Sequence, residues 1–448
     1  MTDRLQAGPY RILRMEGGIE VPFYIIPFDK RGLCDGPETR RHLIRSVKEG
    51  AYSDIFLFSH GWNNDWTVAT RRYEDFLKGY MTMRRTYNLP MPPGYRPLLV
   101  GVFWPSTALV FGESEAGPKI AAGDPAAVDE QVAHERREIR ELADELPRDE
   151  ARRFYELTQK PALSEQEALI LADIARRFFY HETDEELKTG APLSEEEIVA
   201  LWAAAAPESG EDLEDFGTAG AEPSAGPRAA GLGDLVKKLD PRNIVRGLTV
   251  YQMKDRAGTV GAHGVGPMLR ELLAAGDSRL HLIGHSYGGK VVLSATSFGG
   301  DLPRKVESML LLQPAVSHLC FAETVPGTTH AGGYRPALAR VNKPILTTFS
   351  AHDFPLTKTF HLALRRRDDL GEVKIAGAGD PPSKYAALGG FGPRGAGERI
   401  IDIRDAGQPY EWPAGTEVIG LRGTRTIQGH GDISNESTWW ALYSLAST

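Results

Sequence analysis

A serine between two glycines is the first residue whose type and setting could do chemistry. Residues 284–288 read Gly-His-Ser-Tyr-Gly, which matches the nucleophile-elbow pattern Gly-x-Ser-x-Gly. In an elbow the serine stands on a strained turn between a strand and a helix, where flanking side chains would collide with neighbouring backbone. Ser286 is therefore our candidate nucleophile, and the helix behind it would point its positive end at the reaction site.

The residues on either side of this pentapeptide supply the context that the pattern requires. The apolar run 280–283 precedes it and predicts a strand, and the helix-compatible run 290–293 follows. The pentapeptide alone also fits a tight glycine-rich turn with a structural serine, but strand, turn and helix in this order favour a nucleophile.

Two further stretches complete a resemblance to a known superfamily. Residues 60–64 read His-Gly-Trp-Asn-Asn, and residues 104–106 read Trp-Pro-Ser after the next predicted strand. With the elbow, these stretches resemble the α/β-hydrolase superfamily, in particular a little-characterised bacterial branch of it. The resemblance covers about 50–105 and 255–448. It implies the α/β-hydrolase fold and a serine hydrolase, and identifies no substrate.

The base that activates Ser286 should be a histidine, because a serine hydroxyl is a poor nucleophile until its proton is removed. The superfamily's chain order is serine, acid, histidine, which restricts the candidates to His318, His330, His352, His361 and His430. We expect His430, since it lies between glycines after the last predicted strand and just before the last predicted helix. The superfamily places its base at that point.

The acid must orient the imidazole and stabilise its charged form. Asp353 follows a predicted strand at 344–350, where the superfamily usually places the acid. Its neighbour His352 leaves an alternative, in which His352 is the base and Asp353 or Asp432 assists. Otherwise we expect Asp432 to stabilise the loop of His430.

Two backbone N–H groups should bind the oxyanion of the reaction. The residue after the nucleophile, Tyr287, supplies one, and the resemblance implies Trp62 as the other. We expect His60 to support this loop rather than transfer protons, and we assign His60, Gly61 and Trp104 to the substrate-binding region. The aromatic side chains here either line an acyl pocket or belong to the core.

We expect no metal and no cofactor. The sequence has no His-Glu-x-x-His helix, no cysteine pair with ligand spacing and no Walker-type phosphate loop. The glycines at 258–266 do not follow a predicted strand. We interpret them as a flexible entry to a helix near 262–275.

Short apolar runs separated by helical patterns predict an α/β fold with a mostly parallel sheet and helices on both faces. The predicted strands are a hairpin at 10–15 and 20–27, then 54–59, 98–103, 280–284, 308–313, 344–350 and 417–421. The predicted helices include 37–48, 66–80, one from 288 and a final one at 435–445.

A helical insertion interrupts this alternation. We predict a hydrolase domain in two parts, 1–109 and 246–448, around an insertion at 110–245 that contains a linker at 207–232. Three capping boxes predict helix starts in the insertion: Ser164 with Glu167, Thr183 with Glu186, and Ser194 with Glu197. The insertion is either a lid or a partner-binding appendage, and its place before the elbow strand is unusual for a lid.

Composition sets broad limits on partners and location. The chain has 448 residues, a formal net charge of −8 and two cysteines. This charge gives no general attraction to nucleic acid or to an anionic membrane. No apolar stretch is long enough to span a bilayer, and no secretory signal is visible, so we expect a cytoplasmic protein. Its partner would be a small-molecule or lipid-like ester substrate, with a protein partner on 110–245 as a further possibility.

The resulting function is hydrolysis of a carboxylic ester through an acyl-enzyme, as in esterases and lipases. Amidase and thioesterase activity remain open, because the same triad serves all of these reactions. A different class also remains open, a binding or scaffold protein on a hydrolase fold, because fold alone does not imply activity.

Overall fold

The structure is a computed structural model that describes most of the chain. The described residues are 7–106 apart from 16, 17, 51, 63 and 91; 139, 142–143, 146–160, 162–176, 194–195 and 198–199; 252–359 apart from 299; and 386–447 apart from 413.

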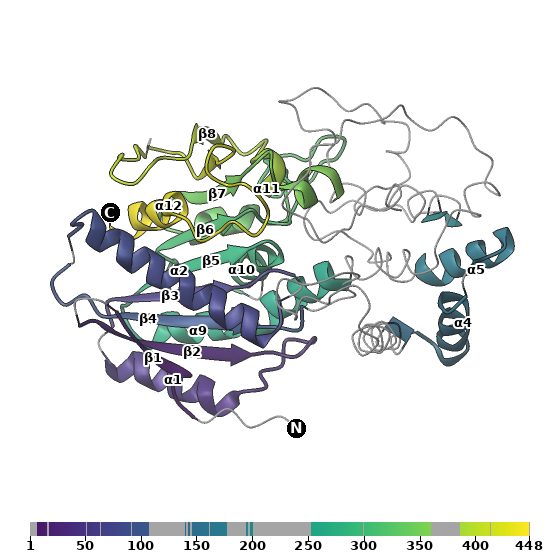
Figure 1. Ribbon diagram of the computed structural model, residues 1–448, viewed down its shortest axis with the longest axis horizontal. Coiled ribbons are helices and arrows are strands. Elements are labelled where there is room, and N and C mark those ends of the chain that lie inside the picture. Colours follow the sequence, from purple (N-terminus) through teal and green to yellow (C-terminus); the bar gives the residue numbers. More distant parts are fainter. Residues whose placement is uncertain are drawn as a thin grey trace, which may run out of the picture.

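A nine-stranded sheet forms the centre of the described chain (Figure 1). Its strands are β1 Arg11–Arg14, β2 Glu20–Pro27, β3 Asp54–Ser59, β4 Pro97–Phe103, β5 Arg279–His285, β6 Ser308–Leu312, β7 Ile345–Phe349, β8 Arg399–Asp402 and β9 Val418–Arg422. Their order across the sheet is β1-β2-β4-β3-β5-β6-β7-β9-β8. Strand β1 pairs antiparallel with β2, as the predicted hairpin requires, and every other described pair is parallel.

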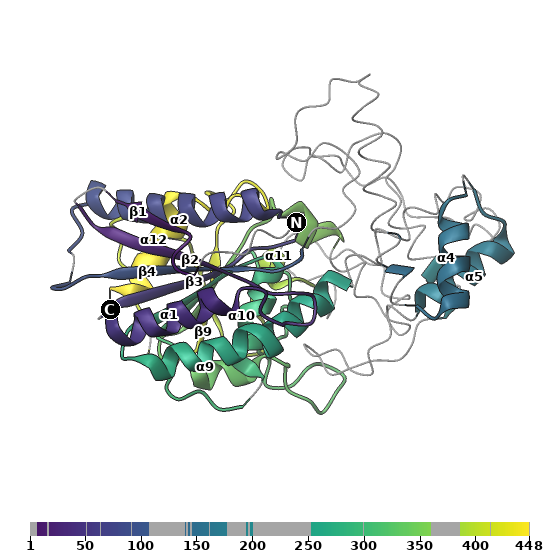
Figure 2. The ribbon, with the colours of Figure 1, turned by 90° about the horizontal axis from the view of Figure 1, so that it is seen from below.

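Helices cover both faces of this sheet (Figure 2). One face carries α1 Pro37–Gly50, α9 Gly266–Ala275 and α10 Tyr287–Ser297. The other carries α2 Trp66–Thr86 and α12 Glu436–Ala446, which contact each other. The α/β class and the mostly parallel sheet with helices on both faces are therefore confirmed.

The central strands are apolar because both of their faces are buried. In β3 every residue is buried, and alternate side chains enter different cores. Ile55 and Leu57 pack in the core under α1, α9 and α10, whereas Phe56 and Phe58 pack in the core under α2 and α12. The carboxyl ends of these parallel strands meet at one edge of the sheet, where the loops carrying the candidate site begin.

Two sequence predictions about this domain were incomplete or wrong. Strand β8 was not predicted, since its four residues lie at the sheet edge and none is fully buried. The glycines at 258–266 are not a flexible entry: residues 252–259 are helical and continue through a π-helical segment, Val260–Val265, into α9. A Cβ on Gly261 would lie 2.4 Å from the Val291 carbonyl oxygen, so this glycine permits close packing on α10.

The described part of the predicted insertion contains two helices, α4 Arg148–Thr158 and α5 Glu165–Arg176, which share a small hydrophobic core of their own. The capping box of α5 is confirmed: the Glu167 N–H donates to Ser164 Oγ at 3.3 Å, and the Ser164 N–H donates to Glu167 Oε2 at 2.9 Å. Thr183, Glu186, Glu197, the linker at 207–232 and the boundaries near 110 and 245 lie outside the described residues.

No helix in the described ranges is both long and apolar enough to cross a membrane. Neither Cys34, which is partly buried, nor Cys320, which is buried, forms a disulfide bond.

Candidate active site

Ser286 stands at the tip of the turn between β5 and α10. Its backbone has φ 55° and ψ −125°, a conformation that residues other than glycine rarely adopt. Three non-glycine residues of the described chain have positive φ, and two of them, Ser286 and Gln313, lie at this site. Strain of this kind costs on the order of 1–3 kcal/mol and persists only where the surrounding structure enforces it.

The glycines of the elbow let other backbone segments approach closely. A Cβ on Gly284 would lie 2.6 Å from the Gly288 carbonyl oxygen, across the turn. A Cβ on Gly288 would lie 2.1 Å from the Ser59 carbonyl oxygen, at the end of β3. Both contacts involve backbone that cannot move aside cheaply, so the elbow requires glycine at both positions.

The structure brings the three predicted catalytic side chains into one hydrogen-bonded chain. Ser286 Oγ lies 2.9 Å from His430 Nε2, and His430 Nδ1 lies 2.8 Å from Asp353 Oδ2. Because a carboxylate only accepts, His430 carries its proton on Nδ1 and leaves Nε2 free to accept from the serine hydroxyl. The residues that meet here are separated by 144 and 77 positions in the sequence.

Asp353 is fully buried and is held by a local turn after β7. Its second carboxylate oxygen, Oδ1, accepts from the Leu356 N–H at 3.1 Å, and its own N–H donates to the Ser350 carbonyl at 3.2 Å. Both carboxylate oxygens therefore have a donor. The carboxylate is fixed in orientation, and His430, whose side chain is 20% exposed, remains accessible above it.

Two buried residues that sequence reasoning did not assign hold the His430 loop in place. Gln313 Nε2 donates to the carbonyls of Gly429 at 2.9 Å and His430 at 3.1 Å. His285 Nε2 lies 2.8 Å from the same His430 carbonyl and must donate to it. Burial lowers the pKa of His285 well below its ordinary value, so its ring stays neutral. A polar residue directly after a buried strand was the available signal for Gln313.

The loop that carries the predicted oxyanion donor packs directly on the elbow. A Cβ on Gly61 would lie 2.7 Å from Ser286 Cβ and 3.1 Å from His285 Nδ1. The next residue, Trp62, is partly buried, and its carbonyl accepts from Asn64 Nδ2 at 2.7 Å. Asn63 lies outside the described residues. Tyr287 follows the nucleophile as the first residue of α10. Tyr287 therefore adjoins Ser286 in the chain, and Trp62 follows the glycine that packs on Ser286; their role as oxyanion donors stays a prediction.

His60 lies beneath this loop as a neutral side chain. Its Nδ1 lies 2.8 Å from the Gly61 carbonyl and donates, whereas its Nε2 accepts from the Trp104 N–H at 3.3 Å. Burial lowers the pKa of His60 to about 4. The Trp104 ring stacks on the imidazole at 5.5 Å and is fully buried. Both side chains support the loop from inside, and their assignment to substrate binding stays a prediction.

The remaining residues of the predicted set fall at the edge of the site or away from it. His352 is exposed beside Asp353, and His330 is exposed elsewhere. His318 is buried, and His361 lies outside the described residues. Asp432 accepts from the Gln428 N–H at 3.0 Å across the His430 loop, which is the stabilising role expected of it.

A second buried serine, histidine and aspartate meet near the opposite edge of the sheet. His281 Nδ1 lies 2.8 Å from Ser308 Oγ, and His281 Nε2 lies 3.0 Å from Asp54 Oδ1. Asp54 also pairs with Arg279 at 2.7 Å. Burial alone would raise the pKa of Asp54, but hydrogen bonds from His281 and Ser53 and the charge of Arg279 hold it below its ordinary value. This arrangement lies inside the sheet domain and links β3, β5 and β6.

Within the described ranges no group of three or more histidine, cysteine, aspartate or glutamate side chains is arranged to hold a metal ion. Comparison with protein-family models, with curated proteins and with solved structures found no match. The resemblance to the α/β-hydrolase superfamily stays a prediction from the motifs.

Proposed function

We propose that this protein is a serine hydrolase that cleaves carboxylic esters through an acyl-enzyme. The observation that carries the proposal is the hydrogen-bonded chain from Ser286 Oγ through His430 to Asp353, with distances of 2.9 and 2.8 Å. An activated nucleophile requires a base within about 2.6–3.2 Å and a third group that orients the base.

In the proposed reaction Ser286 Oγ attacks the ester carbonyl while His430 Nε2 takes the hydroxyl proton. The imidazolium that forms is stabilised by Asp353 through the Nδ1–H hydrogen bond. The carbonyl oxygen becomes an oxyanion, which the backbone N–H groups of Trp62 and Tyr287 would bind. One such donor is typically worth about 3–4 kcal/mol.

The tetrahedral intermediate then collapses and expels the alcohol, which takes its proton from His430. A water molecule attacks the acyl-enzyme with His430 as base, and a carboxylic acid leaves with Ser286 restored. We favour esters over amides as substrates because an alcohol is a better leaving group than an amine. Its departure therefore depends less on protonation by His430. The strain at Ser286 supports the proposal, since such strain is enriched at functional sites.

A fluorophosphonate probe tests the reaction class without knowledge of the substrate. The wild-type protein should be labelled on Ser286, and Ser286→Ala should lose labelling with its thermal unfolding unchanged. Ser434→Ala is a matched control, because Ser434 is an exposed serine on the loop after His430. A folded wild-type protein that the probe does not label would refute the proposal.

p-Nitrophenyl esters of graded acyl length test the ester assignment. Their hydrolysis should require Ser286 and His430, and the preferred length would report the size of the acyl site. If the fluorophosphonate labels the protein but no ester in the series is hydrolysed, the assignment of Ser286 as nucleophile stands and the assignment of carboxylic esters as substrates is rejected.

A further inference from the structure

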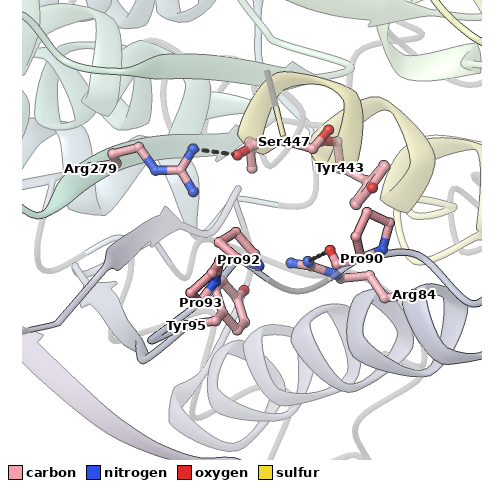
Figure 3. A pocket seen from close by; sticks show the side chains of 9 residues that line it. Arg84, Pro90, Pro92, Pro93, Tyr95, Arg279, Tyr443 and Ser447 are labelled. Carbon is pink, nitrogen blue, oxygen red and sulfur yellow. Dashed lines mark hydrogen bonds between the residues drawn. The ribbon is translucent and has the colours of Figure 1, made fainter.

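A pocket of about 240 Å³ lies at the opposite edge of the sheet from Ser286 (Figure 3). It lies where β5 begins, at Arg279, and where α2 ends, near Arg84. Tyr95, which precedes β4, and the last residues of α12 complete its wall. We call it the Arg84 pocket. Its volume is below the 300–1,000 Å³ of sites that take drug-sized ligands, so it suits a smaller molecule.

Two guanidinium groups reach this space from opposite sides, Arg279 from the strand and Arg84 from the helix (Figure 3). No acidic side chain of the described chain lines the pocket. Arg279 already pairs with Asp54 at 2.7 Å, which balances its charge. Arg84 makes no ion pair with a described residue, so the described part of the lining carries one positive charge without an acidic partner.

Arg84 is only 3% exposed, which makes its uncompensated charge costly. The rings of Tyr80, Tyr95 and Tyr443 lie 4.7–5.6 Å from its guanidinium carbon and offset part of that cost. Its two hydrogen bonds go to neutral acceptors, the Tyr80 hydroxyl at 3.1 Å and the Pro90 carbonyl at 2.7 Å. Its Nε–H is buried and has no partner among the described residues.

We propose that the Arg84 pocket binds a small organic monocarboxylate. A carboxylate supplies one negative charge and the planar acceptor pair that a guanidinium binds best. A single charge matches the single uncompensated arginine, whereas a dianion would leave a buried negative charge. The apolar part of the ligand would lie against the tyrosine rings and the prolines at 90, 92 and 93.

This site is separate from the proposed catalytic centre, because β5 spans the sheet between Arg279 and Ser286. The proposal does not depend on hydrolase activity. It can therefore be tested on the full-length protein without an activity assay.

Benzoate is the probe, since it joins one carboxylate to a flat apolar ring. Titration calorimetry should show saturable binding of one benzoate per chain. Benzamide has nearly the same shape without the charge and should bind at least tenfold more weakly. Inorganic phosphate, which lacks the apolar part and carries more charge, should also bind more weakly. Benzamide or phosphate binding as tightly as benzoate would overturn the assignment.

Two arginine variants locate the binding. Arg84→Gln should weaken benzoate binding at least tenfold. Arg85→Gln should leave it unchanged, because Arg85 is the exposed neighbour on the same helix turn and does not line the pocket. Equal binding by wild type and Arg84→Gln would place benzoate elsewhere, including near Ser286, and would overturn the proposal.

Ser447→Trp provides a second variant in case Arg84→Gln does not fold. Ser447 is exposed at the rim of the pocket, so a bulky ring there should block entry without disturbing the core. Thermal unfolding checks the fold of each variant. Undiminished benzoate binding to folded Ser447→Trp would contradict binding in this pocket.

Discussion

Replacing His60 by asparagine should reduce the pH dependence of folding stability. In the folded protein His60 is neutral, because its Nδ1 donates to the Gly61 carbonyl while its Nε2 accepts from the Trp104 N–H. A second proton on Nε2 would break the latter bond and place a charge in a fully buried site. Asparagine is neutral at every pH and retains a side-chain N–H donor.

The size of the effect follows from the two pKa values of His60. Burial lowers the pKa to about 4, against 6.5 for the ordinary side chain. Between these values the unfolded chain binds a proton that the folded chain does not, so stability falls as the pH falls from 6.5 to 4. The values differ by about 2.5, which corresponds to a total loss of about 3 kcal/mol. About 2 kcal/mol of this loss lies between pH 7 and pH 4.5.

Urea unfolding at pH 7 and at pH 4.5 measures the effect. The stability difference between the two pH values should be about 2 kcal/mol smaller in His60→Asn than in wild type. Other groups that titrate in this range, such as His285, are present in both proteins and cancel. His330→Asn is the matched control: it removes an exposed histidine and should leave the pH dependence unchanged.

An unchanged pH dependence in His60→Asn would refute the argument, because it would mean that His60 has the same proton affinity folded and unfolded. A larger dependence in the variant would contradict the sign. A lower stability of His60→Asn at pH 7 does not by itself test the argument, because the substitution also removes the stacking on Trp104.

Three further predictions concern buried contacts. Gln313→Leu leaves the Gly429 carbonyl without its side-chain donor. The free energy of unfolding should therefore fall by roughly 1–3 kcal/mol, and the rate of fluorophosphonate labelling should also fall. Wild-type stability and labelling in that variant would exclude a positioning role. Gly61→Ala places a Cβ 2.7 Å from Ser286 Cβ and should lower kcat roughly 100-fold by moving the oxyanion loop, while a wild-type kcat in the ester assay would show that the loop is not needed. Asp54→Asn should destabilise the protein by about 1.5–3 kcal/mol at pH 7, the usual value of hydrogen bonds to a charged group, and should flatten the acid limb of its stability profile. The Asp54 contribution is present above the ordinary pKa of 3.8 and is lost as the pH falls through the lower folded value, so an acid limb identical to wild type would contradict it.

The central strands could be predicted because burial on both faces leaves an unbroken apolar run. Strand β3 is the clearest case, with six buried residues. The edge strand β8 could not be predicted from the sequence. It has only four residues, all of them partly buried or exposed, so it lacks the buried apolar run that marks a central strand. The glycines near 261 were misinterpreted for a related reason. Glycine lowers helix propensity, but here its missing side chain permits contact with α10, and that packing outweighs propensity.

Ser286, His430 and Asp353 could be predicted to meet, because each follows a predicted strand of a parallel sheet and such strand ends converge. The residues that hold the His430 loop, Gln313 and His285, could not be predicted from the sequence. Gln313 acts through its side-chain amide on carbonyls 116 and 117 positions away. The role of His285 likewise depends on a bond to a distant carbonyl. Neither residue type nor spacing indicates which loop will lie above such a side chain.

The described residues contain two serine–histidine–aspartate arrangements, so residue type alone does not identify a nucleophile. In the second arrangement Ser308 lies within β6, and both its histidine and its aspartate are fully buried. No substrate can reach that hydroxyl without opening the sheet. Ser286 differs in two physical respects: its backbone holds positive φ at the end of a strand, and its histidine is 20% exposed. Strain at the serine and access to the base therefore distinguish the candidate active site from a polar network that joins three strands.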